Sequence, residues 1–512
     1  MRNLIIRSIL KGWGKFFMEC QNIRYTYKNL AFAIVNLSTM LDILKIENPH
    51  IILIGKNSFN WIVVYLTAII KGIPLTLIPS TFDDTYKSSY INDSLGNIVI
   101  SDDFKSFKPL SNRFVNVFIK LDDFQLWYIR KSAIDYPMKK MGKWHQLYDI
   151  KNNSITPELF EKFKGELKHD NFHVYSYTAG VSNPPSRVMN DTSLILRVMK
   201  GMERQLLKAK LRKKNISIQA DFASFHAITF LPVLGITGQI TDVGANAVIA
   251  GTDYYESMWD YTVSFMTEKQ SMYLERWFVT RWINTIRLRK EYRKYFLGLD
   301  EKLFILNDET HTRLKPNLQR IGFEVFSTYG TAQSGQLVAI NGRVIKDVKI
   351  RIDTANPEKN PGNLLVTVPT GSLAQQMHIT GDVAYIGKNS ELIIHGKRSA
   401  QIITPSQQII YPEEIENGVR AYELVDQCIV FEHESEGIVL GASFKQFAID
   451  ARGMTMAEVE LLLNEIKEDI NGVLPTELNL DTSVLLARPV KTNEQGKIIR
   501  WYYKHTPLEL GL

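Results

Sequence analysis

The residues near the end of the chain have the types and the order that phosphate chemistry requires. Gly496 directly precedes Lys497 in a polar turn, and the apolar residues 484–486 come before it. A glycine lets the backbone bend tightly and approach a ligand closely, and a lysine supplies a flexible positive charge that can reach an anion. Residues 489–500 therefore predict a loop that touches a phosphate group.

A second segment of small and hydroxyl residues, 177–188, follows a strand-like stretch at 172–177. A strand that leads into such a loop can surround phosphate oxygens with backbone N–H groups. An ordinary turn before a helix gives the same pattern, so this segment alone leaves both interpretations open.

Several short segments, in order along nearly the whole chain, resemble motifs of the adenylate-forming superfamily, which includes acyl-CoA synthetases, stand-alone adenylation domains and luciferases. The segments that carry the resemblance are 24–30, 55–61, 71–74, 177–188, 224–226, 327–333, 380–382 and 411–416, followed by Lys497. The triplet Thr380-Gly381-Asp382 is intact, and residues 411–416 match the family pattern well.

The resemblance implies a role for each matching side chain. Tyr329 would stack on adenine, Asp382 would accept the ribose hydroxyls, and His226 would flank the acyl pocket. Lys497 would stabilise the charge that builds on the carboxylate and the α-phosphate, and fixed charge of this kind is worth roughly 3–4 kcal/mol. The implied ATP- or AMP-binding residues are Thr178, Gly180, Ser182, Arg187, Asp308, Tyr329, Gly330, Thr331, Asp382 and Arg398.

The chain departs from the family pattern where magnesium and the phosphates would bind. Gln333, the candidate catalytic and metal-binding residue after Tyr329, stands where the family has a glutamate. It offers an oxygen without the charge that Mg²⁺ prefers. The other departures are Val181, Asn183, Ser186 and Ala332. Two hypotheses follow: an active ligase, or a homologue that keeps the fold and binds a nucleotide or a partner without turnover.

The position of the second ribose-contacting residue depends on the register. Counting back from residues 411–416 places it at Arg398 and puts a hinge at Ala400, whereas counting from Gly396 places it at Lys397. The resemblance implies an N-terminal AMP- and acyl-binding domain, residues 1–399, and a small mobile C-terminal domain, residues 400–512, that carries the terminal lysine.

Alternating helices and apolar strands indicate that the N-terminal part is an α/β domain with a mainly parallel sheet. The expected strands are 51–55, 75–79, 97–101, 245–250 and 303–306, and the expected helix is 59–71. Residues 343–352, 363–369 and 383–394 alternate more, which indicates an antiparallel or barrel-like subregion. Strands and helices return from about residue 402, with a helix near 456–472, so the C-terminal domain is expected to be α+β.

The composition is that of a globular protein with a large core, since 45% of the 512 residues are hydrophobic and 22% are charged. A net charge of +7 favours anionic partners such as nucleotides or coenzyme A. The basic residues are scattered, so we expect no nucleic-acid binding.

Cys20 and Cys428 are far apart in sequence and form no metal motif, which suits free thiols in a reducing, cytoplasmic compartment.

The N-terminal residues 2–17 mix apolar and basic side chains in the pattern of an amphipathic helix. Arg7 and Lys11 interrupt the apolar stretch, and no cleavage site follows, so we reject a secretion signal. A first helix packed on the domain and a peripheral contact with a membrane surface are the two interpretations that stay open.

Together the motifs predict an AMP-forming acid–thiol ligase that uses ATP and Mg²⁺. A carboxylic acid, fatty or aryl, would be activated as an acyl-adenylate. The acceptor thiol would belong to coenzyme A or to the phosphopantetheine of a separate acyl carrier protein. Amino acids are disfavoured as substrates, because Asp221 lies in the wrong register to bind an α-amine.

Overall fold

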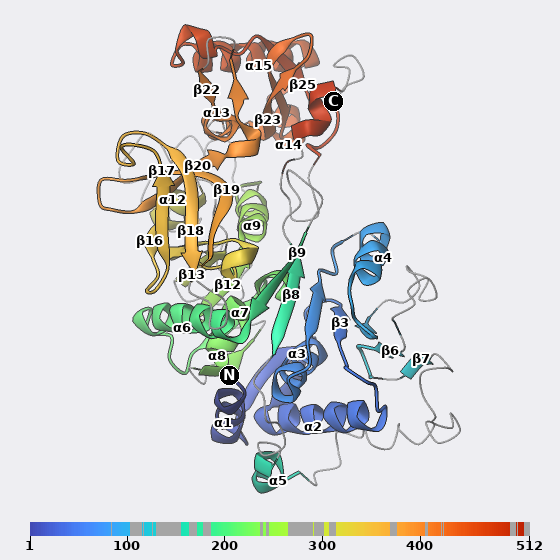
Figure 1. The fold of residues 1–512 in the computed structure, drawn as a ribbon. Helices are drawn as coiled ribbons and strands as arrows, with labels where there is room; N and C mark the ends of the chain where they lie inside the picture. Colours follow the sequence, from blue (N-terminus) through green and yellow to red (C-terminus); the bar gives the residue numbers. More distant parts are fainter. Residues whose placement is uncertain are drawn as a thin grey trace.

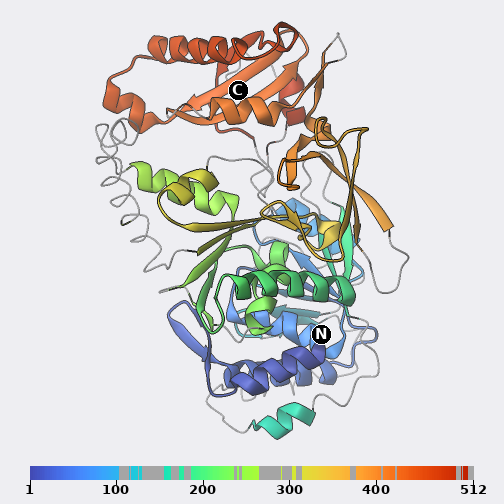
Figure 2. The ribbon, with the colours of Figure 1, turned by 90° about the vertical axis from the view of Figure 1, so that its left-hand side faces the viewer.

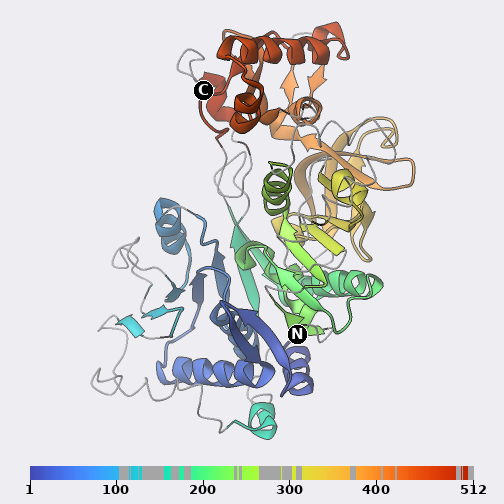
Figure 3. The same ribbon diagram turned by 180° about the vertical axis from the view of Figure 1, so that it is seen from behind.

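The computed structural model describes residues 1–82, 84–102, 115, 117–124, 126–129, 155–162, 172–177, 186–235, 239–241, 245–264, 290, 302–306, 314–368, 376–404, 408–420, 422, 424–491, 498 and 500–505. In Figure 1 the chain passes from a blue sheet through a green sheet and an orange sheet to a red C-terminal part at the top. Figure 3 shows the same arrangement from behind.

The first sheet has seven strands in the order β7-β6-β5-β3-β4-β8-β9. They are β3 (Ile51–Ile54), β4 (Leu75–Ile78), β5 (Ile98–Ser101), β6 (Val117–Lys120), β7 (Leu126–Ile129), β8 (His173–Tyr177) and β9 (Arg187–Asp191). Every residue of β3, β4 and β5 is buried, as expected for parallel strands that are covered on both faces. The three strands predicted in this region are confirmed.

The helix predicted at residues 59–71 is confirmed as α3 (Phe59–Lys71). Ser58 caps its start, and Gly72 ends it in the left-handed conformation that glycine adopts most easily. Its side chains Trp61 and Tyr65 pack against the aromatic rings of Phe222 and Phe230. Because α3 is enclosed on all sides, it has to be apolar all round.

The second sheet has nine strands in the order β16-β15-β14-β13-β12-β10-β11-β1-β2. They are β1 (Phe16–Cys20), β2 (Ile23–Thr26), β10 (Asn215–Ile218), β11 (Gln239–Ile240), β12 (Ala247–Gly251), β13 (Lys302–Leu306), β14 (Glu324–Tyr329), β15 (Ala339–Ile340) and β16 (Arg343–Val344). Strands β1 and β10 to β14 are parallel to their neighbours in this set. Their carboxyl ends therefore share one edge, where open α/β sheets place their ligands.

The third sheet is antiparallel, with strands in the order β17-β18-β19-β20. They are β17 (Lys349–Asp353), β18 (Gly362–Val368), β19 (Gln376–Ile386) and β20 (Leu392–Lys397). The expected antiparallel region is confirmed. The expected barrel-like closure is wrong for the described residues, because the outer strands β17 and β20 pair only with β18 and β19, so the sheet stays open.

Helices cover the sheets of the N-terminal part. They are α1 (Arg2–Gly12), α2 (Tyr27–Ile43), α4 (Asp84–Asp93), α5 (Pro157–Lys162), α6 (Thr192–Lys208), α7 (Phe222–Thr229), α8 (Leu231–Gly235), α9 (Thr252–Ser264) and α12 (Leu314–Arg320), with the short turns η2 (Ala332–Ser334) and η3 (Arg398–Ala400). The N-terminal helix α1 packs with α2, α3 and α8, and Ile5, Ile6 and Ile9 on it are buried. The protein itself thus covers these three isoleucines, whereas Leu4 on the same helix is 38% exposed. Among the described residues, no helix is long and apolar enough to cross a membrane.

Residues 402–505, which we call the C-terminal lobe, have hydrophobic cores of their own. The lobe contains β21 (Ile402–Ile403), β22 (Ile409–Ile410), α13 (Pro412–Val419), β23 (Val425–His433), β24 (Gly437–Phe444), α14 (Gln446–Arg452), α15 (Met456–Asn471), η4 (Thr476–Leu478), β25 (Thr482–Leu485) and η5 (Arg500–His505). Helix α15 confirms the helix predicted near 456–472. Figure 2 shows the lobe at the top, at the end of the molecule opposite α1. The domain boundary at residue 400 and the mobility of the lobe stay predictions.

Candidate functional site

The candidate site is built around Asp382, a carboxylate that is only 2% exposed. The Tyr329 hydroxyl donates a hydrogen bond to its Oδ2, and the Lys397 ammonium pairs with its Oδ1. These residues lie at the end of β14, in β19 and at the end of β20. We call Tyr329, Asp382 and Lys397 the Asp382 cluster. Both carboxylate oxygens are partnered, which is the condition for burying a charge without a large cost.

The local backbone holds Asp382 in place. Gly381 has a φ of +81°, a conformation that residues with a side chain rarely adopt. The Thr380 hydroxyl accepts the Asp382 N–H at 3.1 Å and donates to the Leu364 carbonyl at 3.0 Å. Asp382 and Lys397 stand opposite each other across β19 and β20. The register of the third sheet therefore brings this pair together.

The turn after β14 is fixed by close packing. A Cβ atom at Gly330 would lie 2.1 Å from the carbonyl carbon of Gln336, so a larger residue would displace the backbone. Thr331 caps η2 through reciprocal hydrogen bonds with Ser334. Tyr329, Gly330 and Thr331, which the resemblance places at the nucleotide, thus form one rigid turn at the carboxyl edge of the second sheet.

His378 is a polar residue of this region that the sequence analysis missed. It lies on β19, and its Nε2 is 3.2 Å from the Thr331 hydroxyl oxygen. Burial lowers the pKa of the His378 imidazole, so the ring is neutral near pH 7. A lone histidine in a strand carries no sequence signal. Only the contact with the turn after β14 identifies it.

Gln333, the candidate catalytic and magnesium-binding residue, is exposed on η2. Its amide oxygen is neutral, whereas Mg²⁺ is held by carboxylates together with substrate phosphates. In the described part of the chain, no group of three histidine, cysteine, aspartate or glutamate side chains could hold a metal ion. The described residues therefore do not form a magnesium site by themselves.

Lys397, and not Arg398, reaches the Asp382 carboxylate. The Arg398 side chain is exposed at the start of η3, whereas Lys397 contacts Asp382 directly. Lys397, the residue that the count from Gly396 gives, is thus the side chain that lies at this carboxylate. A ribose contact by Arg398 stays a prediction.

Arg187 begins β9, directly opposite Tyr177 at the end of β8. Its Nη1 donates to the Asp93 carbonyl oxygen at 3.2 Å, and its guanidinium lies 4.9 Å from the ring centre of Tyr175. Residues 178–185, between these two antiparallel strands, lie outside the described residues, so both interpretations of the candidate phosphate loop stay open.

Five of the predicted site residues lie outside the described residues, and their roles stay predictions. They are Thr178, Gly180, Ser182, Asp308 and Lys497.

The residues that flank the terminal-lysine segment are anchored in the lobe. The Lys491 N–H donates to the Tyr503 hydroxyl at 2.5 Å, and the Val490 N–H donates to Oε1 of Gln427 at 2.7 Å. These bonds fix the chain immediately before residues 492–497.

After that segment, Arg500 enters a buried charge cluster. Its Nη2 lies 2.7 Å from both carboxylate oxygens of Glu416, and its Nη1 lies 3.5 Å from Oε1 of Glu413. Burial lowers the pKa of the Arg500 guanidinium, but the two carboxylates outweigh burial and raise it. A two-bond pair of this kind is a strong and directional contact, so it holds the start of η5 on α13.

His226, predicted at the acyl pocket, lies on α7 in the hydrophobic core. It is 4% exposed, and its ring centre is 5.3 Å from that of Tyr65. Neither ring nitrogen has a hydrogen-bond partner among the described residues. Burial lowers the pKa of His226 to about 3, so the imidazole is neutral. Its role at an acyl pocket stays a prediction.

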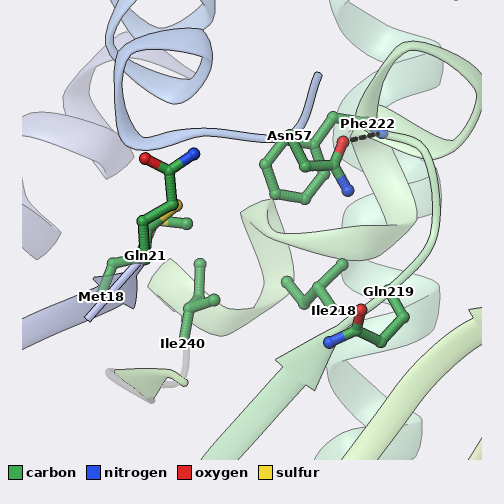
Figure 4. A pocket seen from close by; sticks show the side chains of 8 residues that line it. Met18, Gln21, Asn57, Ile218, Gln219, Phe222 and Ile240 are labelled. Carbon is green, nitrogen blue, oxygen red and sulfur yellow. Dashed lines mark hydrogen bonds between the residues drawn. The ribbon is translucent and has the colours of Figure 1, made fainter. Parts of the chain in front are cut away.

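A hollow of about 340 Å³ opens at the carboxyl ends of β1, β11 and β10 (Figure 4). Asn57 braces one wall, since its Oδ1 accepts the Phe222 N–H at 2.9 Å and its Nδ2 donates to the Ala220 carbonyl at 2.7 Å. The lining residues are Met18, Cys20, Gln21, Asn57, Ile218, Gln219, Phe222 and Ile240. None of these side chains is charged. The sequence analysis missed the hollow because its walls come from separate segments of the chain.

No family model and no curated protein matches the sequence, but solved structures match the fold over nearly the whole chain. O-succinylbenzoate coenzyme A synthetase (MenE) from Bacillus subtilis, in complex with ATP and magnesium ion, is 13% identical, with a TM-score of 0.69 over 98% of this chain and 99% of that chain. A benzoate CoA ligase from Burkholderia xenovorans LB400 is 12% identical, with a TM-score of 0.72 over 98% and 99%. The anthranilate CoA ligase AuaEII, in complex with anthranoyl-AMP, is 11% identical, with a TM-score of 0.71 over 98% and 96%. At such identities the likeness concerns the fold, and the chain adopts the fold of the adenylate-forming (ANL) ligases.

Proposed function

We propose that the protein is an AMP-forming carboxylate ligase. A carboxylate oxygen attacks the α-phosphorus of ATP, the bond from that phosphorus to the β-phosphate oxygen breaks, and pyrophosphate leaves. A thiol then attacks the acyl carbon of the resulting acyl-adenylate, and AMP leaves as the thioester forms. Magnesium enters with the nucleotide as part of the substrate.

The observation that carries this proposal is the meeting of Tyr329, Thr331 and Asp382 at the carboxyl edge of the second sheet. A carboxylate after a tight glycine turn suits two ribose hydroxyls, which would replace its present partners. The neighbouring phenol ring of Tyr329 offers a surface on which adenine can stack. Structures with the same fold are described in complexes with ATP, AMP and acyl-adenylates, which supports a nucleotide at the corresponding edge here.

The hollow lined by uncharged side chains is our candidate for the body of the acid. Four strand spacings of about 4.8 Å separate β11 from β14, so the hollow lies roughly 19 Å from the Asp382 cluster along the sheet edge. An acid that is activated near the cluster and also fills the hollow has to be long, which supports a fatty acid. The names of the structural neighbours, a benzoate and an anthranilate ligase, support an aryl acid instead.

The acceptor is proposed to be the thiol of coenzyme A or of a phosphopantetheine on a separate acyl carrier protein. The neighbours named as CoA ligases support the first of these. The comparison of rates with coenzyme A and with a loaded carrier protein separates the two acceptors.

Pyrophosphate release tests the proposal directly. We expect release with ATP, Mg²⁺ and at least one acid from a series of octanoate, dodecanoate, hexadecanoate and benzoate. A rate that rises with chain length supports use of the hollow, and a preference for benzoate supports a short aryl site. Lys497→Ala should lower the rate at least about 100-fold, by the magnitude of a lost transition-state charge.

Lys504→Ala is the matched control, because Lys504 forms an exposed ion pair with Glu432 at 2.9 Å. Such pairs contribute little, so this variant should release pyrophosphate within about twofold of the parent rate. No release with any acid, combined with measurable AMP binding, would favour the alternative of a nucleotide-binding homologue without turnover.

A further inference from the structure

The positive charge of the protein is concentrated in two segments that are far apart in sequence. Residues 1–15 and 192–214 together hold twelve lysines and arginines and one acidic residue, Glu203, which gives a formal charge of +11. The whole chain has a net charge of +7, so the rest of it is net negative. The expectation that the basic residues are scattered is therefore wrong for these two segments.

The fold brings the two segments together. Helices α1 and α6 both pack on α8, and Figure 2 shows them one above the other on the side that faces the viewer. Residues 1–15 lead into β1 and residues 192–214 lead into β10. Both strands pair in parallel with β11, so that Met18 and Ile216 share Ile240 as their register partner. About two strand spacings of 4.8 Å separate the chain at these points, so the basic ends of both segments meet at the amino edge of the second sheet.

The basic side chains of both helices face solvent. Six of them, on α1, just after α1 and on α6, are exposed, and none has a hydrogen bond or an ion pair with another described side chain. Glu203 is turned toward α8, since its Oε1 would lie 3.0 Å from a Cβ atom at Gly235. The six exposed residues are Arg7, Lys11, Lys15, Lys200, Arg204 and Lys208.

The turn between α6 and β10 adds four more exposed basic residues, 210 and 212–214. Lys210 and Lys213 each have a φ of +58°, a conformation that glycine adopts more easily, so turn chemistry does not explain lysine there. The acidic neighbour Glu324 is paired with Lys302 at 3.1 Å, and Lys302 also donates to the Ala209 carbonyl at 2.6 Å. Glu324 therefore leaves the turn positively charged. We call these four residues and the six on the helices the basic surface.

Two exposed leucines lie among these charges. Leu4 on α1 is 38% exposed, and Leu207 on α6 is 43% exposed. Helices that present basic and apolar side chains together bind the headgroup region of anionic membranes. Nucleic-acid phosphates, in contrast, are held by charged and polar groups. The two leucines therefore favour a lipid surface as the partner.

The position of the basic surface also separates the possible partners. It lies at the amino edge of the second sheet, whereas the Asp382 cluster and the hollow lie at the carboxyl edge. A carrier protein has to place its thiol at the carboxyl edge, so the amino edge does not suit it. A bilayer at the amino edge leaves the carboxyl edge open to solvent. Helix α5, which packs on α1, presents the exposed Glu158 and limits the basic surface on that side.

We propose that the basic surface docks the protein on a bilayer that contains anionic lipids. The lysines and arginines pair with lipid phosphates and carboxylates, and Leu4 and Leu207 enter the boundary between headgroups and acyl chains. The contact is peripheral and reversible, because salt screens such charges over a distance of about 10 Å at 0.1 M. The inference goes beyond the proposed function and does not depend on it.

Sedimentation of the full chain with lipid vesicles tests the inference. The protein should sediment with phosphatidylcholine vesicles that contain about 30% phosphatidylserine and should not sediment with phosphatidylcholine alone. Raising the salt from about 0.1 M to about 0.5 M should release it. The variant Lys208→Gln/Arg212→Gln/Lys214→Gln removes three charges and leaves Lys210 and Lys213 in place. At roughly fivefold for each charge, its partition coefficient should fall about 100-fold.

The matched control is Lys349→Gln/Lys359→Gln/Lys388→Gln, which removes three exposed charges from the third sheet and its turns. These residues lie outside the basic surface, so the control should bind vesicles within about twofold of the parent. Thermal unfolding of both triple variants verifies that each is folded.

Equal binding of the parent to the two kinds of vesicle would overturn the inference, and so would equal losses in the two triple variants. A parent chain that binds a DNA duplex of mixed sequence but no vesicles would also overturn it, because the basic surface would then belong to a nucleic acid. None of these outcomes involves pyrophosphate release, so the proposed function is tested separately.

Discussion

Two buried polar regions of the N-terminal part differ in how their polar atoms are satisfied. In the Asp382 cluster, both carboxylate oxygens have a donor. In the core around α7, the Tyr65 hydroxyl and both ring nitrogens of His226 have no hydrogen-bond partner among the described residues. The cluster holds a charge that is compensated, whereas the α7 core holds polar groups that stay neutral.

The difference teaches which region can exchange its partners with a ligand. Ribose hydroxyls can replace the present hydrogen-bond donors of Asp382, because each carboxylate oxygen then exchanges one donor for another and none is left unpaired. The α7 core offers no such exchange. Burial raises the pKa of Tyr65 and lowers that of His226, and both changes favour the neutral forms. Four substitutions test this comparison.

The largest effect is expected for Asp382→Ala, which leaves the Lys397 ammonium without its carboxylate. Breaking a buried pair of this kind costs about 3–5 kcal/mol, so urea unfolding should show a loss in that range. Pyrophosphate release should fall at least about 100-fold. Asp353→Ala is the control, because Asp353 pairs with Arg351 at an exposed position of the same sheet. Equal losses for the two variants would contradict a special role for the cluster.

The next effect is expected for His226→Leu. The pKa of His226 is about 3 in the folded chain against an ordinary 6.5, so the unfolded chain binds more protons between these values. Folding stability therefore falls as the pH drops through this window, by roughly 2 kcal/mol at pH 5. The His226→Leu variant should lose this pH-dependent part of the free energy of unfolding, which unfolding titrations at pH 5 and pH 8 would reveal. An unchanged pH dependence would show that the imidazole is hydrated.

A smaller effect of opposite sign is expected for Asp221→Asn. Asp221 caps α7, since its Oδ1 accepts the Ala223 N–H at 2.8 Å, and burial raises its pKa from 3.8 to about 6. Between pH 3.8 and about 6 the folded chain therefore binds more protons than the unfolded chain, so the free energy of unfolding falls as the pH rises through this range. Asparagine keeps the cap and removes the charge, and the variant should be more stable by about 1–2 kcal/mol at pH 8. Thermal unfolding at pH 4 should show no such gain.

The smallest effect is expected for Tyr329→Phe, which removes one hydroxyl and keeps the ring. The loss of one hydrogen bond to a charged group should cost about 1–2 kcal/mol of folding stability, while a stacking surface for adenine remains. The KM for ATP should change less than for Asp382→Ala. Tyr385→Phe on β19 is the control. A larger effect of Tyr385→Phe than of Tyr329→Phe would show that the hydroxyl of Tyr329 is not the important one.

Much of the fold could be predicted from local pattern. The helix at 59–71 is apolar throughout and lies between Ser58 and Gly72, which are a start and a stop signal. The strands at 51–54, 75–78 and 98–101 are short apolar runs that only a sheet covered on both faces can bury. The open edge of the third sheet could not be predicted, because strand alternation is the same in an open sheet and in a barrel.

The candidate site could be predicted less completely. Tyr329 and Asp382 were found because each stands next to a glycine in a recognisable short motif. His378 and the hollow at β1, β10 and β11 were missed, because their neighbours are distant in sequence. The register at the end of β20 was ambiguous by one residue, and such a shift turns a side chain to the other face of a strand.

The sequence by itself determined the α/β class and the principal buried helices and strands, because these depend on local periodicity and turn chemistry, and it contained the short segments that resemble nucleotide-binding motifs. The tertiary structure alone decided that Lys397 and not Arg398 neutralises Asp382. The reason is physical: the pairing of a buried charge is set by which side chains the packed sheets bring within reach, and chain order does not encode that distance.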